Sequence, residues 1–97
     1  MWYWLMATAK PHATPDVIAA KRHQWVAQGR DQQLAQRCRT AQRYVVEGAS
    51  PPKVFWLLET DAPDVVKLIT DHFGDLWDIE VVRVTPQSIA QASPSRS

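Results

Sequence analysis

Strand segments that are apolar on both faces constrain this chain more than any other feature. A strand directs alternate side chains to opposite faces, so its sequence shows which faces need cover. In the predicted strands at residues 2–9, 53–60 and 78–84, apolar side chains occupy both alternating sets of positions. The first of these strands places three large or apolar residues on each face: Trp2, Trp4 and Met6 on one, and Tyr3, Leu5 and Ala7 on the other. A sheet of such strands must be covered on both sides.

Helix signals occupy the segment after the first strand. Thr14 suits an N-cap and Pro15 the first helical position, which predicts a helix from Pro15 through the region of Trp25. Gly29 breaks or kinks this helix, and residues 31–37 have a helical pattern again.

A strand at about 40–47 precedes the loop GASPP, and a second helix follows the strand at 53–60. Asp61 is its predicted cap, and Gly74 stands where a helix ends. The resulting order is strand, helix, strand, strand, helix, strand, which is the pattern of the ferredoxin-like α+β fold. We expect one domain over residues 1–90, with a four-stranded antiparallel sheet and two helices on one face. Residues 91–97 are predicted to form a flexible tail.

Two helices can cover only one face of such a sheet. The opposite face would expose a larger apolar patch than monomers normally carry. A second copy related by a two-fold axis would cover it with the same face. We therefore expect a homodimer or a higher homo-oligomer, with two sheets packed face to face.

Composition limits the classes of partner. The 97 residues carry eleven basic and ten acidic side chains, for a net charge of +1, so nothing favours nucleic acid or an anionic membrane as the partner. The apolar start at residues 1–6 is too short for a membrane span or a signal peptide. Cys38 is the only cysteine, which suits a reducing cytoplasm. The three histidines have no metal-ligand spacing, and we expect neither a metal nor a cofactor.

Several short strings together resemble a known family: LAQR at 34–37, VVEG at 45–48, DIEV at 78–81 and PQSIA at 86–90. They are similar to muconolactone isomerase and its relatives, in the dimeric α/β-barrel superfamily. The resemblance covers most of residues 2–90. It implies two ferredoxin-like sheets packed face to face and an isomerase that acts on a lactone or a related carboxylated compound. Residues 38–44 and 50–52 depart from the isomerase, whose corresponding strand is rich in tryptophan, histidine and tyrosine.

The reaction that the resemblance implies moves a proton next to a lactone carbonyl. It needs a general base, and a cation or hydrogen-bond donor for the developing enolate. Glu80, Arg83 and His72 are the catalytic candidates, and Glu59 is a further carboxylate candidate for the ligand pocket. Charges on strands also commonly reach solvent or pair across the sheet. A histidine on an apolar helix face, as His72 is, commonly binds a backbone carbonyl in the core.

Four further candidates concern ligand binding. Lys21 and Arg22 project into the apolar arc of the first helix, where they could hold an anionic ligand between helix and sheet. Alternatively, their stems lie on apolar surface and their charges reach water. Tyr44 and Trp56 could line the pocket or serve only in packing.

Three other functions stay open. A non-catalytic binding or structural dimer fits the same fold, and barrel monooxygenases share it without a metal motif of their own. RNA-binding domains also use ferredoxin-like sheets with aromatic residues on the central strands. The string KVFWL at 53–57 lacks the glycine and the second basic residue of that pattern.

Overall fold

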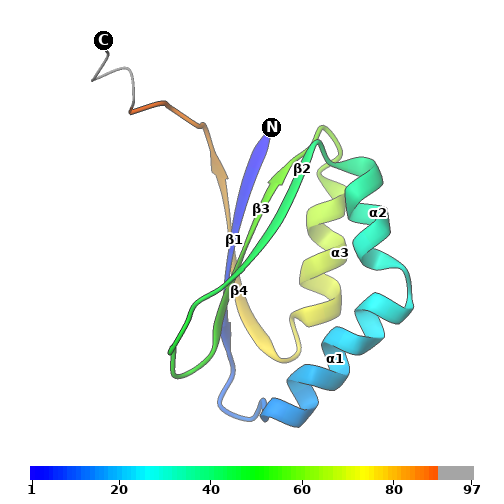
Figure 1. Cartoon of the computed structure of the whole chain (residues 1–97), viewed down its shortest axis with the longest axis vertical. Helices are drawn as coiled ribbons and strands as arrows, with labels where there is room; N and C mark the ends of the chain where they lie inside the picture. Colours follow the sequence, from blue (N-terminus) through cyan, green and yellow to red (C-terminus); the bar gives the residue numbers. More distant parts are fainter. Residues whose placement is uncertain (90–97) are drawn as a thin grey trace.

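The computed structural model describes residues 1–89, which form one sheet and one layer of helices (Figure 1). The elements follow the chain in this order: β1 (Trp2–Ala9), α1 (Pro15–Ala27), α2 (Arg30–Arg37), β2 (Thr40–Val45), β3 (Lys53–Glu59), α3 (Asp64–Phe73) and β4 (Trp77–Val84). The sheet is antiparallel, with the strand order β2-β3-β1-β4. The predicted ferredoxin-like α+β fold is confirmed. The tail predicted at 91–97 lies outside the described residues.

The first predicted helix is two helices. Thr14 caps α1 as predicted, because its side-chain oxygen accepts a hydrogen bond from the Val17 backbone N–H at 3.4 Å. The chain leaves the α1 direction at Gly29, whose φ of 72° is a left-handed conformation that glycine adopts without strain. The chain then turns into α2, whose buried residue is Leu34.

The start of α3 differs from the prediction that Asp61 caps this helix. The helix begins at Asp64, and its cap position, Pro63, makes no side-chain hydrogen bond. Asp61 instead pairs with Arg39 across the end of the sheet, at 3.0 Å. The local turn is held by Thr60, whose hydroxyl oxygen accepts the Ala62 backbone N–H at 3.0 Å and donates to the Arg37 carbonyl at 2.8 Å.

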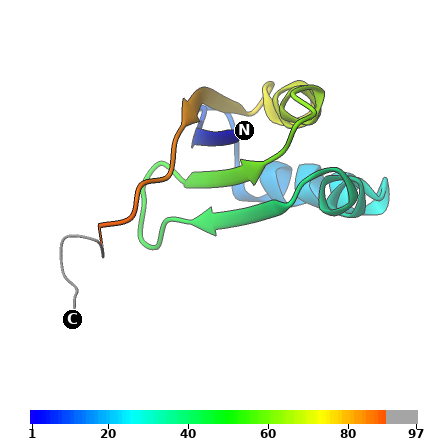
Figure 2. The same cartoon turned by 90° about the horizontal axis from the view of Figure 1, so that it is seen from above.

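The core lies between the sheet and the helices. All three helices are on the same side of the sheet, and Figure 2 shows α1 and α2 beside β2 and β3, with α3 beside β4. Trp25 of α1 is 1% exposed, and its ring centroid lies 5.1 Å from that of Phe73 in α3. Phe73 in turn lies 5.7 Å from Trp56 in β3. This aromatic contact chain joins α1, α3 and the sheet.

The other side of the sheet, here called the open face, has no helix over it (Figure 2). Its apolar residues are Trp2, Trp4, Met6, Tyr44, Phe55, Leu57, Val82 and Val84. Trp4 packs against Phe55 at 5.4 Å and Tyr44 at 6.2 Å between ring centroids. The predicted two-faced character of the strands is therefore confirmed. Residues of the open face are half-buried or exposed, whereas the alternate residues of β1 and β3 are buried.

Candidate functional site

A cleft of about 240 Å³ opens between α1, α2 and the β2–β3 half of the sheet. We call it the helix-side cleft. It is lined by residues of these four elements: Arg22, Asp31, Leu34, Ala35, Ala41, Gln42, Arg43, Trp56 and Leu58. A very small void of about 10 Å³ shares three of these residues with it, Arg22, Arg43 and Trp56, and reaches toward Phe73 and Trp77.

Three charged side chains line the helix-side cleft: Arg22, Asp31 and Arg43. Two of them are bound to each other. Arg22 donates through Nη1 and Nη2 to the two carboxylate oxygens of Asp31, at 3.1 and 2.9 Å. The Trp25 indole N–H also donates to Asp31 Oδ1, at 2.8 Å. A carboxylate that receives three such bonds holds α2 firmly against α1, because bidentate guanidinium pairs are strong and directional.

Arg43 is the third charge, and it differs from the other two. It has no ion pair or hydrogen-bonding side chain among the described residues. Although the residue as a whole is exposed, burial of its guanidinium in the cleft lowers its pKa, and the positive charge of Arg22 lowers it further. An arginine stays protonated at neutral pH in spite of such a shift. The cleft therefore presents one positive charge that forms no ion pair within residues 1–89, although the negative charge of Asp31 partly opposes the effect of Arg22 on it.

The floor of the cleft is apolar. Trp56, directly opposite Arg43 in the β2–β3 register, is 5% exposed, as is Leu34, and Leu58 is fully buried. A guanidinium beside an apolar floor can bind a carboxylate with two parallel hydrogen bonds while the rest of the ligand leaves water. The arrangement suits a small molecule with an apolar body and an anionic end.

Arg22 and Trp56, two residues predicted from the sequence, meet in this cleft. Two other predicted residues, Lys21 and His72, do not line the cleft and are engaged elsewhere. Lys21 binds Asp75 at 3.0 Å, and His72 Nε2 lies 3.0 Å from the Lys21 carbonyl oxygen, an acceptor. His72 also packs against Trp25, at 5.2 Å between ring centroids. These contacts link α1 to α3.

Glu80 and Tyr44 lie on the open face, on the far side of the sheet from the cleft. Glu80 lines a shallow depression of about 490 Å³ whose other residues are Met6, Thr8, Lys53, Phe55, Asp78 and Ile79. Arg83 is on the helix side of β4, exposed and opposite Tyr3. The three predicted catalytic residues are thus spread over three places.

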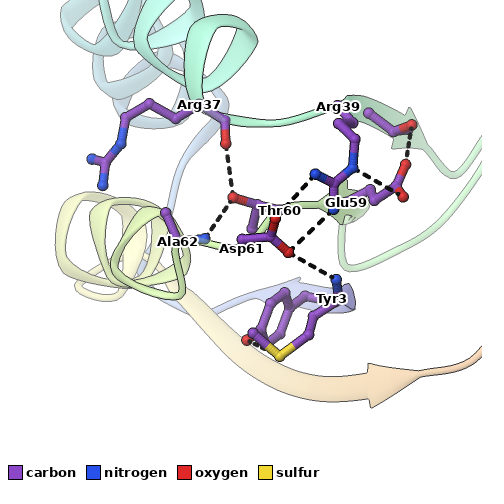
Figure 3. A network of polar contacts seen from close by, with 9 residues as sticks. Tyr3, Arg37, Arg39, Glu59, Thr60, Asp61 and Ala62 are labelled. Carbon is purple, nitrogen blue, oxygen red and sulfur yellow. Dashed lines mark hydrogen bonds and ion pairs between the residues drawn. The ribbon is translucent and has the colours of Figure 1, made fainter.

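Glu59 belongs to a polar network at the end of the sheet (Figure 3). Its carboxylate pairs with Arg39 at 3.3 Å and accepts a hydrogen bond from the Thr40 hydroxyl at 3.4 Å. Arg39 also binds Asp61, which lies 3.7 Å from the Met1 amino group. These pairs tie the starts of β1 and β2 to the end of β3.

Two of the three charged residues of the cleft, Arg43 and Asp31, were not predicted as site residues from the sequence. Arg43 alternates with Ala41 and Val45, so its strand has only a weak apolar pattern on that face. Its place in the cleft depends on the register that sets it opposite Trp56, a long-range pairing. Asp31 lies only nine residues after Arg22, on the other side of the break at Gly29. Two opposite charges placed this closely around a helix break are a sequence signal from which their pairing could have been predicted.

The described residues include no group of three or more histidine, cysteine, aspartate or glutamate side chains arranged to hold a metal ion. Within the same range, every helix is too short or too polar to cross a membrane.

No family model matches the chain, and no curated protein is significantly similar to it in sequence. Solved structures share its fold. The 5-chloro-2-hydroxyhydroquinone dehydrochlorinase of Burkholderia phenoliruptrix, in complex with 2,5-dihydroxybenzoquinone, is 14% identical, with a TM-score of 0.55 over 88% of this chain and 94% of that one. A protein of Arabidopsis thaliana is 16% identical, with a TM-score of 0.54 over 92% and 97% of the two chains. An antibiotic biosynthesis monooxygenase is 15% identical, with a TM-score of 0.51 over 89% and 100%.

Identities of 14–16% establish the fold alone. That fold is the ferredoxin-like fold that the sequence resemblance implied for one subunit. The muconolactone isomerase activity implied by that resemblance stays a prediction.

Proposed function

We propose that this protein binds a small carboxylated compound with an apolar body in the helix-side cleft. The observation that carries the proposal is Arg43, a guanidinium without an ion pair among the described residues, placed opposite the buried Trp56. A guanidinium that lines a cleft without a partner has all its N–H donors available, and an anionic ligand can accept two of them at once.

The size of the cleft narrows the choice of ligand. Pockets for drug-sized ligands usually measure roughly 300–1,000 Å³, so a cleft of about 240 Å³ suits a molecule of one or two rings. Its lining combines an apolar floor with few polar groups, as is usual for small-molecule sites.

Calorimetric titration with 1-naphthoate and with its neutral amide, 1-naphthamide, tests the proposal. We expect the carboxylate to bind at least about tenfold more tightly, because a charge-assisted pair contributes roughly 1.5–3 kcal/mol. Equal binding of the two compounds, or no binding of either, would contradict the proposal.

We further propose that the protein is a homodimer joined through the open face. Eight apolar residues share that face, and the central ones, Trp4, Phe55 and Leu57, come from the two middle strands. Apolar sheet faces of this size are normally covered, and a second copy provides a self-complementary cover. A cytoplasmic location, as the single cysteine suggests, belongs to the same proposal.

Isomerisation of a carboxylated lactone by proton transfer is the second candidate. This candidate is favoured by the carboxylate of Asp31, which lies beside the guanidinium of Arg22 in the helix-side cleft. Both Asp31 oxygens already accept hydrogen bonds, so the base has little free capacity, and binding without turnover fits better. Incubation with muconolactone, followed by proton NMR, would distinguish the two: we expect binding but no product, and accumulation of the isomerised lactone would favour the enzyme.

A further inference from the structure

The charged residues of the helix-side cleft do not balance one another. Arg22 and Arg43 carry two positive charges and Asp31 one negative charge, and no other charged residue lines the cleft. Asp31 neutralises Arg22 through two hydrogen bonds, which leaves the single charge of Arg43 for a ligand.

We propose that Asp31 is a specificity residue that restricts the cleft to ligands with one negative charge. This inference rests on the proposed function and extends it from the type of ligand to its charge. Asp31 stays beside the ligand, because the Trp25 indole holds it independently of Arg22, at 2.8 Å.

The physical reason lies in how two energies grow with charge. Attraction to the cleft is proportional to the ligand charge, whereas the cost of removing the ligand from water grows with its square. With a net charge of one on the cleft, a first negative charge gains more than it costs. A second negative charge gains no additional cation and is repelled by Asp31, and such like-charge contacts cost several kcal/mol in interfaces.

Two probes of the same shape isolate the effect of charge. 1-Naphthyl sulfate carries one negative charge, and 1-naphthyl phosphate carries nearly two at pH 8, because its second pKa is about 6. We expect wild-type protein to bind the sulfate about tenfold more tightly than the phosphate. Equal affinities, or tighter binding of the phosphate, would overturn the inference.

Asp31→Asn provides the matched variant. An asparagine oxygen can still accept the Trp25 N–H, while the negative charge is gone. The phosphate should then gain about tenfold relative to the sulfate. An unchanged ratio in a folded variant would overturn the inference, and if this variant does not fold, equal affinities of the wild-type protein for the two esters would still overturn it.

The same binding measurements distinguish a failure of this inference from a failure of the proposed function on which it rests. If wild-type protein binds neither 1-naphthoate nor the two esters, the cleft is not an anion site and both proposals fail. If it binds 1-naphthoate but shows no preference between sulfate and phosphate, only the role of Asp31 fails.

Discussion

Glu80 and Arg83 lie three residues apart in β4 and point to opposite faces of the sheet. Glu80 is opposite Met6 on the open face, and Arg83 is opposite Tyr3 on the helix side. A base and a cation that act on one substrate must both reach it, so these two residues of one subunit cannot serve the same small ligand.

This separation makes Glu80→Gln a discriminating variant. We expect it to change the affinity of 1-naphthoate for the helix-side cleft less than twofold, because the sheet lies between Glu80 and the cleft. Calorimetry of the variant beside wild type measures this. A tenfold change of affinity in either direction would instead mean that the ligand occupies the depression around Glu80.

The dimer proposal predicts that a charge at the centre of the open face separates the subunits. Leu57 pairs with Trp4 there, so Leu57→Lys would bury an unpaired ammonium in the sheet-to-sheet contact. We expect a monomer by light scattering at micromolar concentration, where wild type is a dimer. Val26→Lys is the control, because Val26 is an apolar residue of α1 that is 50% exposed and lies outside the open face. Monomeric wild-type protein would contradict the proposal.

How far the sequence predicts this molecule depends on how local each signal is. The two apolar faces of β1, the cap at Thr14 and the break at Gly29 are encoded within a few residues, and all three were predicted. The cap at Asp61 was wrong because a tertiary partner, Arg39, competes for its carboxylate. Tertiary ion pairs of this kind leave no periodic pattern in the sequence.

The residues of the helix-side cleft show the same difference between local and long-range signals. Arg22 could be predicted, since a cation within an apolar arc of a helix is locally unusual. Arg43 could not, because β2 is mostly exposed and its role comes from the register that places it opposite Trp56.

The pairing of Asp64 with Arg37 predicts a loss of stability in acid. The hydrogen bond from Arg37 holds the pKa of Asp64 below its ordinary value of 3.8. A carboxylate whose pKa is lower in the folded state stabilises that state above the unfolded pKa, and this contribution is lost as pH falls through the folded pKa.

Asp64→Asn tests this contribution. Denaturant unfolding at a series of pH values should give a wild-type advantage at neutral pH that is progressively lost as the pH falls below the ordinary aspartate pKa of 3.8. Because both side chains are exposed, the advantage should be small. A difference that persists unchanged at low pH would show that the charge of Asp64 is not its source.

Cys38 should react slowly with alkylating reagents. Burial raises the pKa of its thiol above the ordinary value of 9.0, against the opposing influence of the Thr60 hydroxyl and the Arg37 charge. Only the thiolate reacts, so at pH 8 iodoacetamide should alkylate Cys38 more slowly than free cysteine, with the rate still rising above pH 9. Arg37→Gln removes the opposing charge and should slow the reaction further; a faster reaction than free cysteine would contradict this.

The most direct test of the proposed function is the affinity of 1-naphthoate for Arg43→Gln, measured by calorimetry beside wild type and Arg83→Gln. Arg83 is a matched control, because it too has no ion pair among the described residues and lies on the helix side of the sheet, at the opposite edge strand. We expect Arg43→Gln to lose at least about tenfold in affinity and Arg83→Gln to bind as wild type does. Equal affinities for all three proteins would contradict a carboxylate site in the helix-side cleft.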